Sequence, residues 1–594
     1  MTESSVAAGA AAPSGKTWFG HPASLFWLFG TEMWERFGYY GMRALLTLYL
    51  TKHFVLGDRA SAGLYGGYTA LVYLTPLVGG LLADQYLGSK RAVRFGAIIM
   101  AIGYFTLAMG GQPAKPYQVI DGQRFDVVID NFRDTPTSDP REARFLIVGG
   151  QKLAMKGNDD GSLSLVAPDG HVARTVPAGA FTEQAERSPL TLTILLLALS
   201  LISIGNGFFK PNISTMVGEL YAQGDRRRDA GFTIFYMGIN TGSILGQFLC
   251  AFFADSFGWP LGLGLAGVAM VISFFMISFH GGRLDAIGNP PAQERDRSML
   301  IYLGALLAVP VLYFLFTNLM SAAPPVEGSG FVGYIASLSL MGKLLFGTFI
   351  VSVPGILIWS FLAGDRREFE MMLAAMVLIV FNVFFWTLFE QAGSSLTLFA
   401  DRNTDRSVFG WFSLSAPQTQ NFNPIAIVLL APLVSALWGV LAKRGLEPSI
   451  PVKFSIALMG VGAGFLFLVL GASFVGADFK VGLWWLAGLY VIHSLAELCI
   501  SPVGLSMITK LSIARIVGLM MGVWFLSISV AQYVAGVVAQ FASVDTVGGQ
   551  VTNLKVSLDT YAATFTTIAW VAIGAGVVLL ALSFPLKKWM HGVK

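Results

Sequence analysis

Long apolar runs separated by short polar stretches make up most of this 594-residue chain. A helix needs about 20 consecutive apolar residues to cross the hydrocarbon core of a bilayer. The pattern predicts about fourteen membrane-spanning helices on that measure. Their predicted ranges are 24–51, 61–83, 94–111, 189–218, 231–254, 260–280, 298–317, 336–363, 370–400, 422–442, 453–474, 482–508, 516–541 and 561–586.

Residues 112–187 break this pattern, because they are polar and contain only short apolar runs. Pairs of such runs flank Asp121-Gly122, Gly149-Gly150 and Pro168-Asp169-Gly170. These residues favour the tight turns of β-hairpins. The sequence therefore predicts a small β-rich domain outside the membrane, inserted after the third helix.

Composition agrees with a membrane protein and excludes several other classes. Hydrophobic residues make up 54% of the chain and charged residues 12%, whereas a typical soluble protein has about a quarter of its residues charged. The net charge of +4 gives no reason to expect a nucleic-acid partner. Cys250 and Cys499 lie in apolar runs and predict no disulfide framework. Neither a phosphate-binding lysine loop nor a metal-ligand cluster stands out, so no cofactor is expected.

Basic residues in the short loops predict the orientation, because cytoplasmic loops are enriched in lysine and arginine. With fourteen spans, every rich loop falls on one side, which makes both termini cytoplasmic and the insertion extracytoplasmic. The rich loops carry Lys90, Arg91, Arg94, Arg226, Arg227, Arg228, Arg283, Arg295, Arg297, Arg366, Arg367, Lys443, Arg444, Lys453, Lys510, Arg515, Lys587 and Lys588. The alternate loops carry Lys52, Arg59, Arg402, Arg406, Lys480 and Lys555.

These spans predict a multi-pass protein of the cell (inner) membrane with four parts. The Ala/Ser-rich segment 1–20 lacks a signal-peptide pattern and is expected to be a cytoplasmic tail. A six-helix bundle over 21–281 contains the insertion at 112–187. A linker with two additional transmembrane helices follows at 282–365, and a second six-helix bundle covers 366–594.

The first predicted helix contains Glu32, Glu35, Arg36 and Arg43. Each charge inside a spanning helix costs about 2.5–3.5 kcal/mol on insertion scales, and such charges usually have a function. Residues three or four apart are neighbours on a helix surface, so these side chains share one face with Tyr40. We expect this face to line an interior water-filled path. A structural ion pair between Glu32 and Arg36 is the alternative, but it leaves Glu35 and Arg43 unexplained.

Further charged or polar side chains interrupt later predicted helices. Lys210 lies in the fourth helix. Trp386 and Glu390 lie one turn apart in the second half, as do His493 and Glu497, for which helix-to-helix hydrogen bonding is the alternative explanation. Cations in the first half and carboxylates in the second would give a cavity between the halves one positive and one negative wall. That field suits a zwitterion with an amine at one end and a carboxylate at the other.

The energy source can also be inferred from the charged positions. Without an ATP-binding motif, an ion gradient is the expected source of energy for transport. Buried carboxylates can take up protons. Glu32 and Glu35 are therefore candidates for proton coupling.

Three segments carry specific motifs. Residues 32–41 read EMWERFGYYG, residues 208–214 read FFKPNIS, and residues 235–243 read FYMGINTGS. They resemble the ExxERFxYYG motif, the FFKPNIS segment and the FYxxINxGS signature of the proton-dependent oligopeptide transporter family, within the major facilitator superfamily. Residues 80–91 resemble the facilitator loop between helices two and three. The resemblance implies an all-α major facilitator fold of two six-helix bundles. The extra pair near 298–363 is similar to that of bacterial members. The resemblance further implies proton-driven import of di- and tripeptides by alternating access, by a protein expected to be monomeric.

The resemblance also implies individual roles. Proton coupling would involve Glu32, Glu35, Arg36, Lys210 and Glu390. The peptide carboxylate would contact Arg43 and Lys210, and the peptide amine and backbone would contact Glu390, Asn423 and Asn240. Tyr40, Tyr73, Trp386 and Trp524 would line the pocket, with Glu497 as a second-half acidic position.

The sequence departs from the family pattern at two places. Tyr65 is followed by Gly66, not by the histidine of animal members, and the insertion at 112–187 is unusual for bacterial members.

Three other hypotheses about function remain. The substrate could instead be nitrate or a drug. A membrane enzyme would need a nucleophile, metal site or lipid-phosphate motif, and none stands out. A receptor would use 112–187 for sensing, so that deletion of the insertion would abolish its function. Side-chain preference, proton stoichiometry and resting conformation are not predicted.

Overall fold

The computed structural model describes residues 17–132, 141–222, 224–292, 295–321, 333, 336–547 and 550–593. Most of the predicted tail at 1–20 lies outside these residues. The chain forms two compact units. The first contains Met1–Met42, Val72–Met109 and Leu195–Tyr313, and the second contains Arg43–Leu71, Gly110–Ile194 and Phe314–Lys594. The predicted bundle boundaries stay a prediction.

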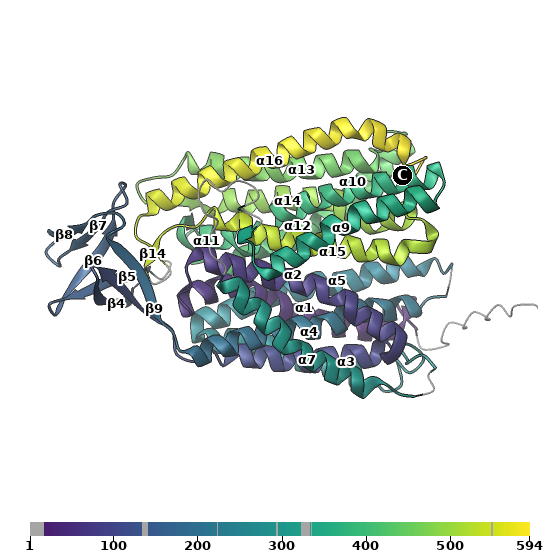
Figure 1. The fold of residues 1–594 in the computed structure, drawn as a ribbon, viewed down its shortest axis with the longest axis horizontal. Helices are drawn as coiled ribbons and strands as arrows, with labels where there is room; N and C mark the ends of the chain where they lie inside the picture. The colour runs from purple at the N-terminus through teal and green to yellow at the C-terminus, as the bar shows by residue number, and fades with distance from the viewer. Residues whose placement is uncertain are drawn as a thin grey trace, which may run out of the picture. The chain divides into compact units, whose positions relative to one another are not determined.

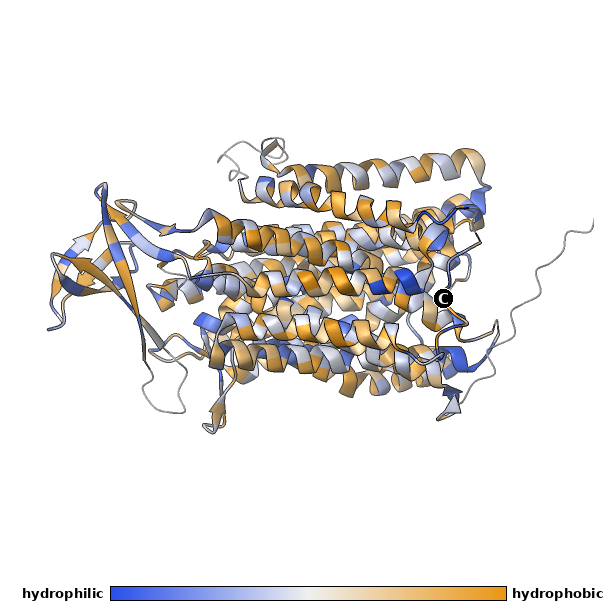
Figure 2. Ribbon diagram, turned by 90° about the horizontal axis from the view of Figure 1, so that it is seen from below, coloured by the Kyte–Doolittle hydropathy of each residue, from blue (hydrophilic) through white to orange (hydrophobic). Residues whose placement is uncertain are grey.

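Within the described residues, thirteen helical spans are long and apolar enough to cross a membrane. Figure 2 colours their hydrophobic residues orange along the ribbon. The elements in these spans are α2 (Asp58–Leu82), η2 (Ala83–Leu87), α3 (Ser89–Ala108), α4 (Pro189–Glu219), α5 (Arg227–Phe257), α6 (Trp259–Ser278), α7 (Ser298–Met320), α9 (Leu340–Ala363), α10 (Arg366–Phe389), η3 (Glu390–Gly393), α11 (Ser395–Arg402), η4 (Pro417–Asn421), α12 (Phe422–Lys443), α13 (Ile450–Ala472), α14 (Leu483–Leu511), η5 (Ala514–Ile516), α15 (Val517–Gln540) and α16 (Leu554–Trp589).

Helix α1 (Ala23–Leu48) accounts for the remaining predicted span. Its 26 residues are enough to cross a bilayer, and it continues into the π-helical turn η1 (Tyr49–His53). It is not among the thirteen apolar spans, and it carries the four charged residues Glu32, Glu35, Arg36 and Arg43. The charges singled out in the sequence therefore distinguish this helix from the other spans.

Burial differs strongly among the helices. In α4, 72% of the most apolar 18-residue window is buried, whereas in α7 and in α9 the buried share is 17%. Large side chains on these two helices, such as Leu307 and Leu362, are exposed. The span of α12 is buried even less, at 11%. Exposed apolar surface of this extent is suited to contact with lipid.

The insertion forms one antiparallel seven-stranded sheet, as its hairpin signals predict. The strand order is β8-β7-β6-β5-β4-β3-β9, so the last strand returns to pair with the first (Figure 1). The strands are β3 (Lys115–Ile120), β4 (Gln123–Phe132), β5 (Arg141–Val148), β6 (Gln151–Gly157), β7 (Leu163–Val166), β8 (Val172–Val176) and β9 (Phe181–Glu186).

Two of the predicted turns have the backbone that their residues favour. Asp121 and Gly122 have φ of 48° and 77°, and Gly149 and Gly150 have φ of 58° and 83°. Two successive positive φ angles give a turn whose twist matches that of the flanking strands. These turns set the registers Ile120 with Gln123 and Val148 with Gln151.

Short two-stranded pairs complete the described structure. The pair most relevant here is β14 (Thr546–Val547) with β15 (Gln550–Val551), which directly precedes α16. The others are β1 (Thr17–Trp18) with β2 (His21–Pro22), β10 (Thr404–Asp405) with β13 (Val481–Gly482), and β11 (Ser407–Val408) with β12 (Phe412–Ser413).

Candidate functional site

Three charged side chains of α1 form a buried cluster in the first unit. Arg36 Nε lies 3.1 Å from Glu32 Oε1 and donates a hydrogen bond to Glu35. Glu32 lies one helical turn from Arg36, which brings the two groups together without help from another element. The side chains are at most 4% exposed. The ring centroids of Tyr39 and Tyr40 lie 5.2 and 5.9 Å from the guanidinium carbon of Arg36.

Lys210 adds a second cation near this cluster. Its ammonium lies 4.3 Å from the ring centroid of Tyr73, and it interacts electrostatically with both Glu32 and Glu35. The group therefore contains two carboxylates and two cations, contributed by α1 and α4. Asn240 on α5 is buried, and its amide donates to the carbonyl oxygen of Tyr236 at 3.0 Å within the same helix.

Arg43 and Glu390 form a direct ion pair in the second unit, although 347 positions separate them. The pair is mostly buried, and Arg43 Nε also donates to the Tyr65 hydroxyl at 2.7 Å. Glu390 follows the last residue of α10, where the helix changes to the 3₁₀ turn η3. The sequence predicted opposite charges on facing walls, and here one charge from each half of the chain neutralises the other.

The remaining second-half residues make two smaller contacts. Asn423 Nδ2 on α12 donates to Glu497 Oε2 at 3.2 Å and to Ser494 Oγ at 3.0 Å, both on α14. On α15, the indole of Trp524 packs against Gly504, where an added Cβ would lie 2.5 Å from the ring. A glycine at that position is therefore required for the contact.

Trp386 and His493 pack among aromatic rings. Trp386 lies 5.5 Å from Phe389, centroid to centroid. His493 Nε2 lies 3.0 Å from the carbonyl oxygen of Val461 on α13. This contact is the helix-to-helix hydrogen bond that the sequence left as the alternative explanation for this histidine.

A second buried ion pair was not singled out from the sequence. Arg402 at the end of α11 donates to both carboxylate oxygens of Asp58, at 2.6 and 2.7 Å, and to the Tyr561 hydroxyl at 3.1 Å. Its side chain is fully buried. Next to it, Lys52 Nζ lies 2.8 Å from Asp401 Oδ1. Arg402 and Lys52 lie at the ends of apolar runs, where a charged residue fits a solvated loop equally well.

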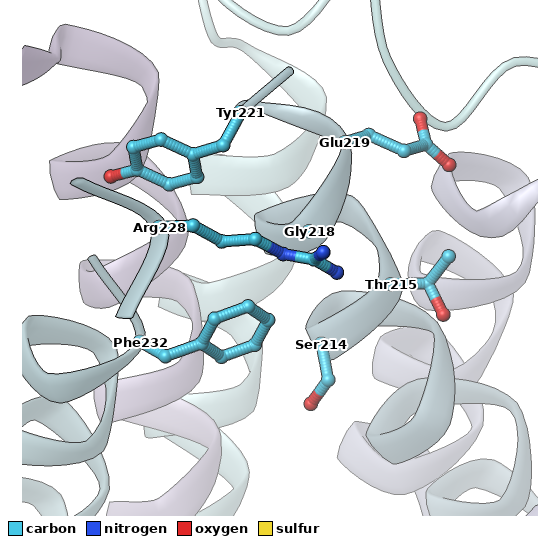
Figure 3. Close-up of a pocket in the computed structure, with 7 residues that line it drawn as sticks. All are labelled: Ser214, Thr215, Gly218, Glu219, Tyr221, Arg228 and Phe232. Carbon is cyan, nitrogen blue, oxygen red and sulfur yellow. The ribbon is translucent and has the colours of Figure 1, made fainter. Parts of the chain in front are cut away.

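An open pocket of about 430 Å³ lies near the C-terminal end of α4 and the start of α5 (Figure 3). Figure 3 shows Arg228 reaching toward α4 beside Gly218, with Phe232 beneath it. The predicted site residues are not among those that line it, which are Ser214, Thr215, Gly218, Glu219, Tyr221, Arg228 and Phe232. In the part of the chain that the structure describes, no group of three or more His, Cys, Asp or Glu side chains could hold a metal ion.

Long apolar helices with buried, paired charges indicate a multi-pass membrane protein, and the comparisons identify it as a transporter. A sequence profile of the POT family matches residues 90–554. The chain is 29% identical over 602 residues to the peptide transporter YePEPT of Yersinia enterocolitica, covering 98% of each chain. It is 28% identical over 570 residues to the dipeptide and tripeptide permease A of Escherichia coli K12, covering 96% of this chain and 93% of the relative.

A solved structure extends the likeness to the fold. The crystal structure of peptide transporter POT in complex with sulfate superposes with a TM-score of 0.71 at 28% identity, covering 97% of this chain and 98% of the other. The fold is therefore the major facilitator fold with a β-rich insertion. This protein belongs to the POT family. Its members are transporters, so the predicted class is confirmed and the membrane-enzyme hypothesis is set aside.

Proposed function

We propose that this protein imports di- and tripeptides together with protons by alternating access, with both termini in the cytoplasm and as a monomer. Family membership and the peptide-transporting relatives support the substrate class. The observation that carries the proton part of the proposal is the buried cluster of Glu32, Glu35 and Arg36, with the half-buried Lys210 close enough to interact with both carboxylates.

This group offers a physical route from peptide binding to proton uptake. With all four side chains charged, two carboxylates balance two cations. A peptide carboxylate that binds Lys210 takes up one of those positive charges. Glu32 and Glu35 then share Arg36 alone, and a net negative charge in a buried site is costly. One proton on either carboxylate restores neutrality, so binding of peptide and proton favour each other.

The Arg43–Glu390 pair suits the termini of a peptide. A zwitterionic peptide brings a carboxylate for Arg43 and an amine for Glu390, so it can replace the pair without leaving either charge unpaired. Tyr65 holds Arg43 in place during such an exchange. We propose that the remaining predicted residues contact the peptide or line its path, namely Tyr40, Tyr73, Asn240, Trp386, Asn423, Glu497 and Trp524.

Uptake of labelled dialanine into proteoliposomes tests this proposal. An inward proton gradient should drive accumulation by the wild-type protein, and Glu35→Gln should abolish that accumulation. The mutant should still exchange dialanine across the membrane without a gradient, because peptide binding itself is kept. Glu447→Gln is a matched control, because Glu447 pairs with Lys453 outside the cluster. If no peptide moves under any gradient, the substrate class is wrong, and anions and drugs should be tested on the same protein.

A further inference from the structure

The β insertion packs with a different part of the chain from the helices that it connects. In sequence it lies between α3 and α4, whose cores belong to the first unit. By its contacts, Gly110–Ile194 belongs to the second unit. Two attachments account for this, one at the base of the sheet and one near its apolar core.

The base is attached to the turn between α1 and α2. Where the chain enters the insertion, Ala114 N donates to the carbonyl oxygen of His53 at 2.8 Å. Where the chain leaves it, Arg187 donates to the carbonyl oxygens of Phe54 and Val55 at 2.8 and 2.6 Å. Hydrogen bonds from a charged guanidinium are roughly twice as strong as neutral ones. Both ends of the insertion are therefore held on one turn.

The second attachment is made by the β14–β15 hairpin, which connects α15 to α16 in the chain. Val547 is 2% exposed and completes the apolar core of the sheet, together with side chains such as Leu146 and Leu163. Figure 1 shows β14 beside the sheet. Burial of a valine side chain stabilises such a contact because its apolar surface leaves water.

Hydrogen bonds around Val547 reinforce the attachment. Gly157 N donates to the carbonyl oxygen of Thr552 at 3.1 Å, and Thr546 Oγ1 donates to Glu183 Oε2 at 3.1 Å. Asn553 Nδ2 donates to Asp159 Oδ1 at 2.9 Å. The glycine permits the approach, since a Cβ at 157 would lie 2.4 Å from Thr552 Oγ1.

We infer that the insertion is a clamp, which joins the α1–α2 turn to the β14–β15 hairpin and must release the hairpin in each transport cycle. This inference rests on the proposed alternating access. Helices α1 and α2 belong to the predicted N-terminal bundle, and α15 and α16 to the predicted C-terminal bundle. Alternating access separates the two bundles at each end in turn. The clamp spans that division, so it stabilises the state in which its own end is closed.

A reversible disulfide tests the clamp. In a background with Cys250→Ala, Cys499→Ala and Thr552→Ala, Gly157→Cys and Asn553→Cys are combined. The Thr552→Ala change removes the hydroxyl that would lie 2.4 Å from a Cβ at 157. An ideal Cβ at 157 lies 3.2 Å from the Asn553 Cβ, near the distance of about 3.8 Å in disulfides. Oxidation should block dialanine uptake, because the covalent link prevents the release that each transport cycle requires, and a reductant should restore uptake. Ile147→Cys with Lys152→Cys is the matched control, because these register partners link β5 to β6 within the sheet.

Cysteine labelling in the absence of peptide tests the clamp independently of the proposed substrate. The carbonyl oxygen of Ala62 on α2 lies 2.7 Å from where a Cβ on Gly536 of α15 would be. Labelling of Ala62→Cys by a membrane-impermeant maleimide should fall when the 157–553 disulfide forms, and should rise in Val547→Asp. Undiminished uptake and labelling in protein whose cross-link is verified by mass spectrometry would overturn the clamp. A third outcome is that the reduced protein transports no peptide but labelling of Ala62→Cys still falls when the disulfide forms. That outcome would support the clamp and refute the proposed substrate.

Discussion

Ion pairs between arginine and a carboxylate occur both among the helices and in the β insertion, but they are buried in the first region and exposed to solvent in the second. In the helices, the Arg402 and Asp58 side chains are 0% and 3% exposed. In the insertion, those of Arg124 and Glu186 are 48% and 63% exposed. Water screens the second pair and makes it weak, whereas the first cannot lose one partner without leaving a charge buried. The buried pair therefore depends on both of its partners, whereas the insertion depends more on its apolar core than on exposed pairs of this kind.

Removal of one partner of the buried pair should produce the largest effect on stability. Arg402→Leu leaves Asp58 buried with a hydrogen bond from Val544 N at 3.1 Å. Such a loss destabilises a protein by about 3–5 kcal/mol, and thermal unfolding in detergent measures it. The double variant Asp58→Asn with Arg402→Leu should recover part of the loss. A single variant as stable as the double one would show that this pair behaves like a surface pair.

Glu390→Gln should have the next largest effect, on transport rather than on folding. It leaves Arg43 with a neutral neighbour and removes the proposed partner of the peptide amine. Loss of one member of a buried charge pair costs about 2–5 kcal/mol in binding, so KM for dialanine should rise at least tenfold. Glu390→Asp keeps the charge and should restore part of the affinity. Wild-type kinetics in Glu390→Gln would remove this pair from the peptide site.

Val547→Ala should weaken the insertion without affecting the helices. Removing two buried methyl groups costs about 1–2 kcal/mol. Hydrogen exchange should quicken in β6 and β7 and stay unchanged in α13. Val172→Ala is the control, because Val172 on β8 is 53% exposed. Equal effects of the two substitutions would contradict the packing of the hairpin into the sheet.

Arg124→Ala should change the stability of the insertion by less than about 0.5 kcal/mol. Its two ion pairs, with Asp126 and Glu186, are both solvent-exposed. Chemical unfolding followed by circular dichroism measures the change. A loss as large as that of Val547→Ala would remove the contrast between the two regions.

The carboxylate of Asp159 should give the clamp almost no pH dependence between pH 5 and 8. The hydrogen bond from Asn553, followed by the charge of Lys555, holds the pKa of Asp159 below its usual value, with neighbouring Asp160 acting in the opposite direction. A lowered pKa contributes stability above the ordinary value near 3.9, and this stability is lost only as pH falls through the lower folded value. Maleimide labelling of Ala62→Cys in Asp159→Asn and in the otherwise unchanged protein should therefore follow the same pH profile from pH 5 to 8. Divergent profiles in that range would contradict this assignment.

The helices were predictable because an apolar run of membrane-spanning length has few other uses. The turns at Asp121-Gly122 and Gly149-Gly150 were predictable because their residues tolerate positive φ. The fourth-helix lysine and the first-helix charges stood out because a charge inside an apolar run is costly. Asp58 and Arg402 did not stand out, because both lie at the ends of apolar runs. The local sequence there does not distinguish a buried charged residue from one exposed in a loop.

The sequence by itself determined the number and length of the spans, the β character of the insertion, and the family motifs, since each depends on local hydrophobicity, spacing or turn chemistry. Tertiary structure decided which charges pair across distant segments, whereas Glu32 and Arg36 pair within one helix. Arg43 with Glu390, Arg402 with Asp58, and Val547 with the core of a distant sheet each join segments hundreds of residues apart. Such pairings depend on how helices and strands pack together, which no local pattern in the chain encodes.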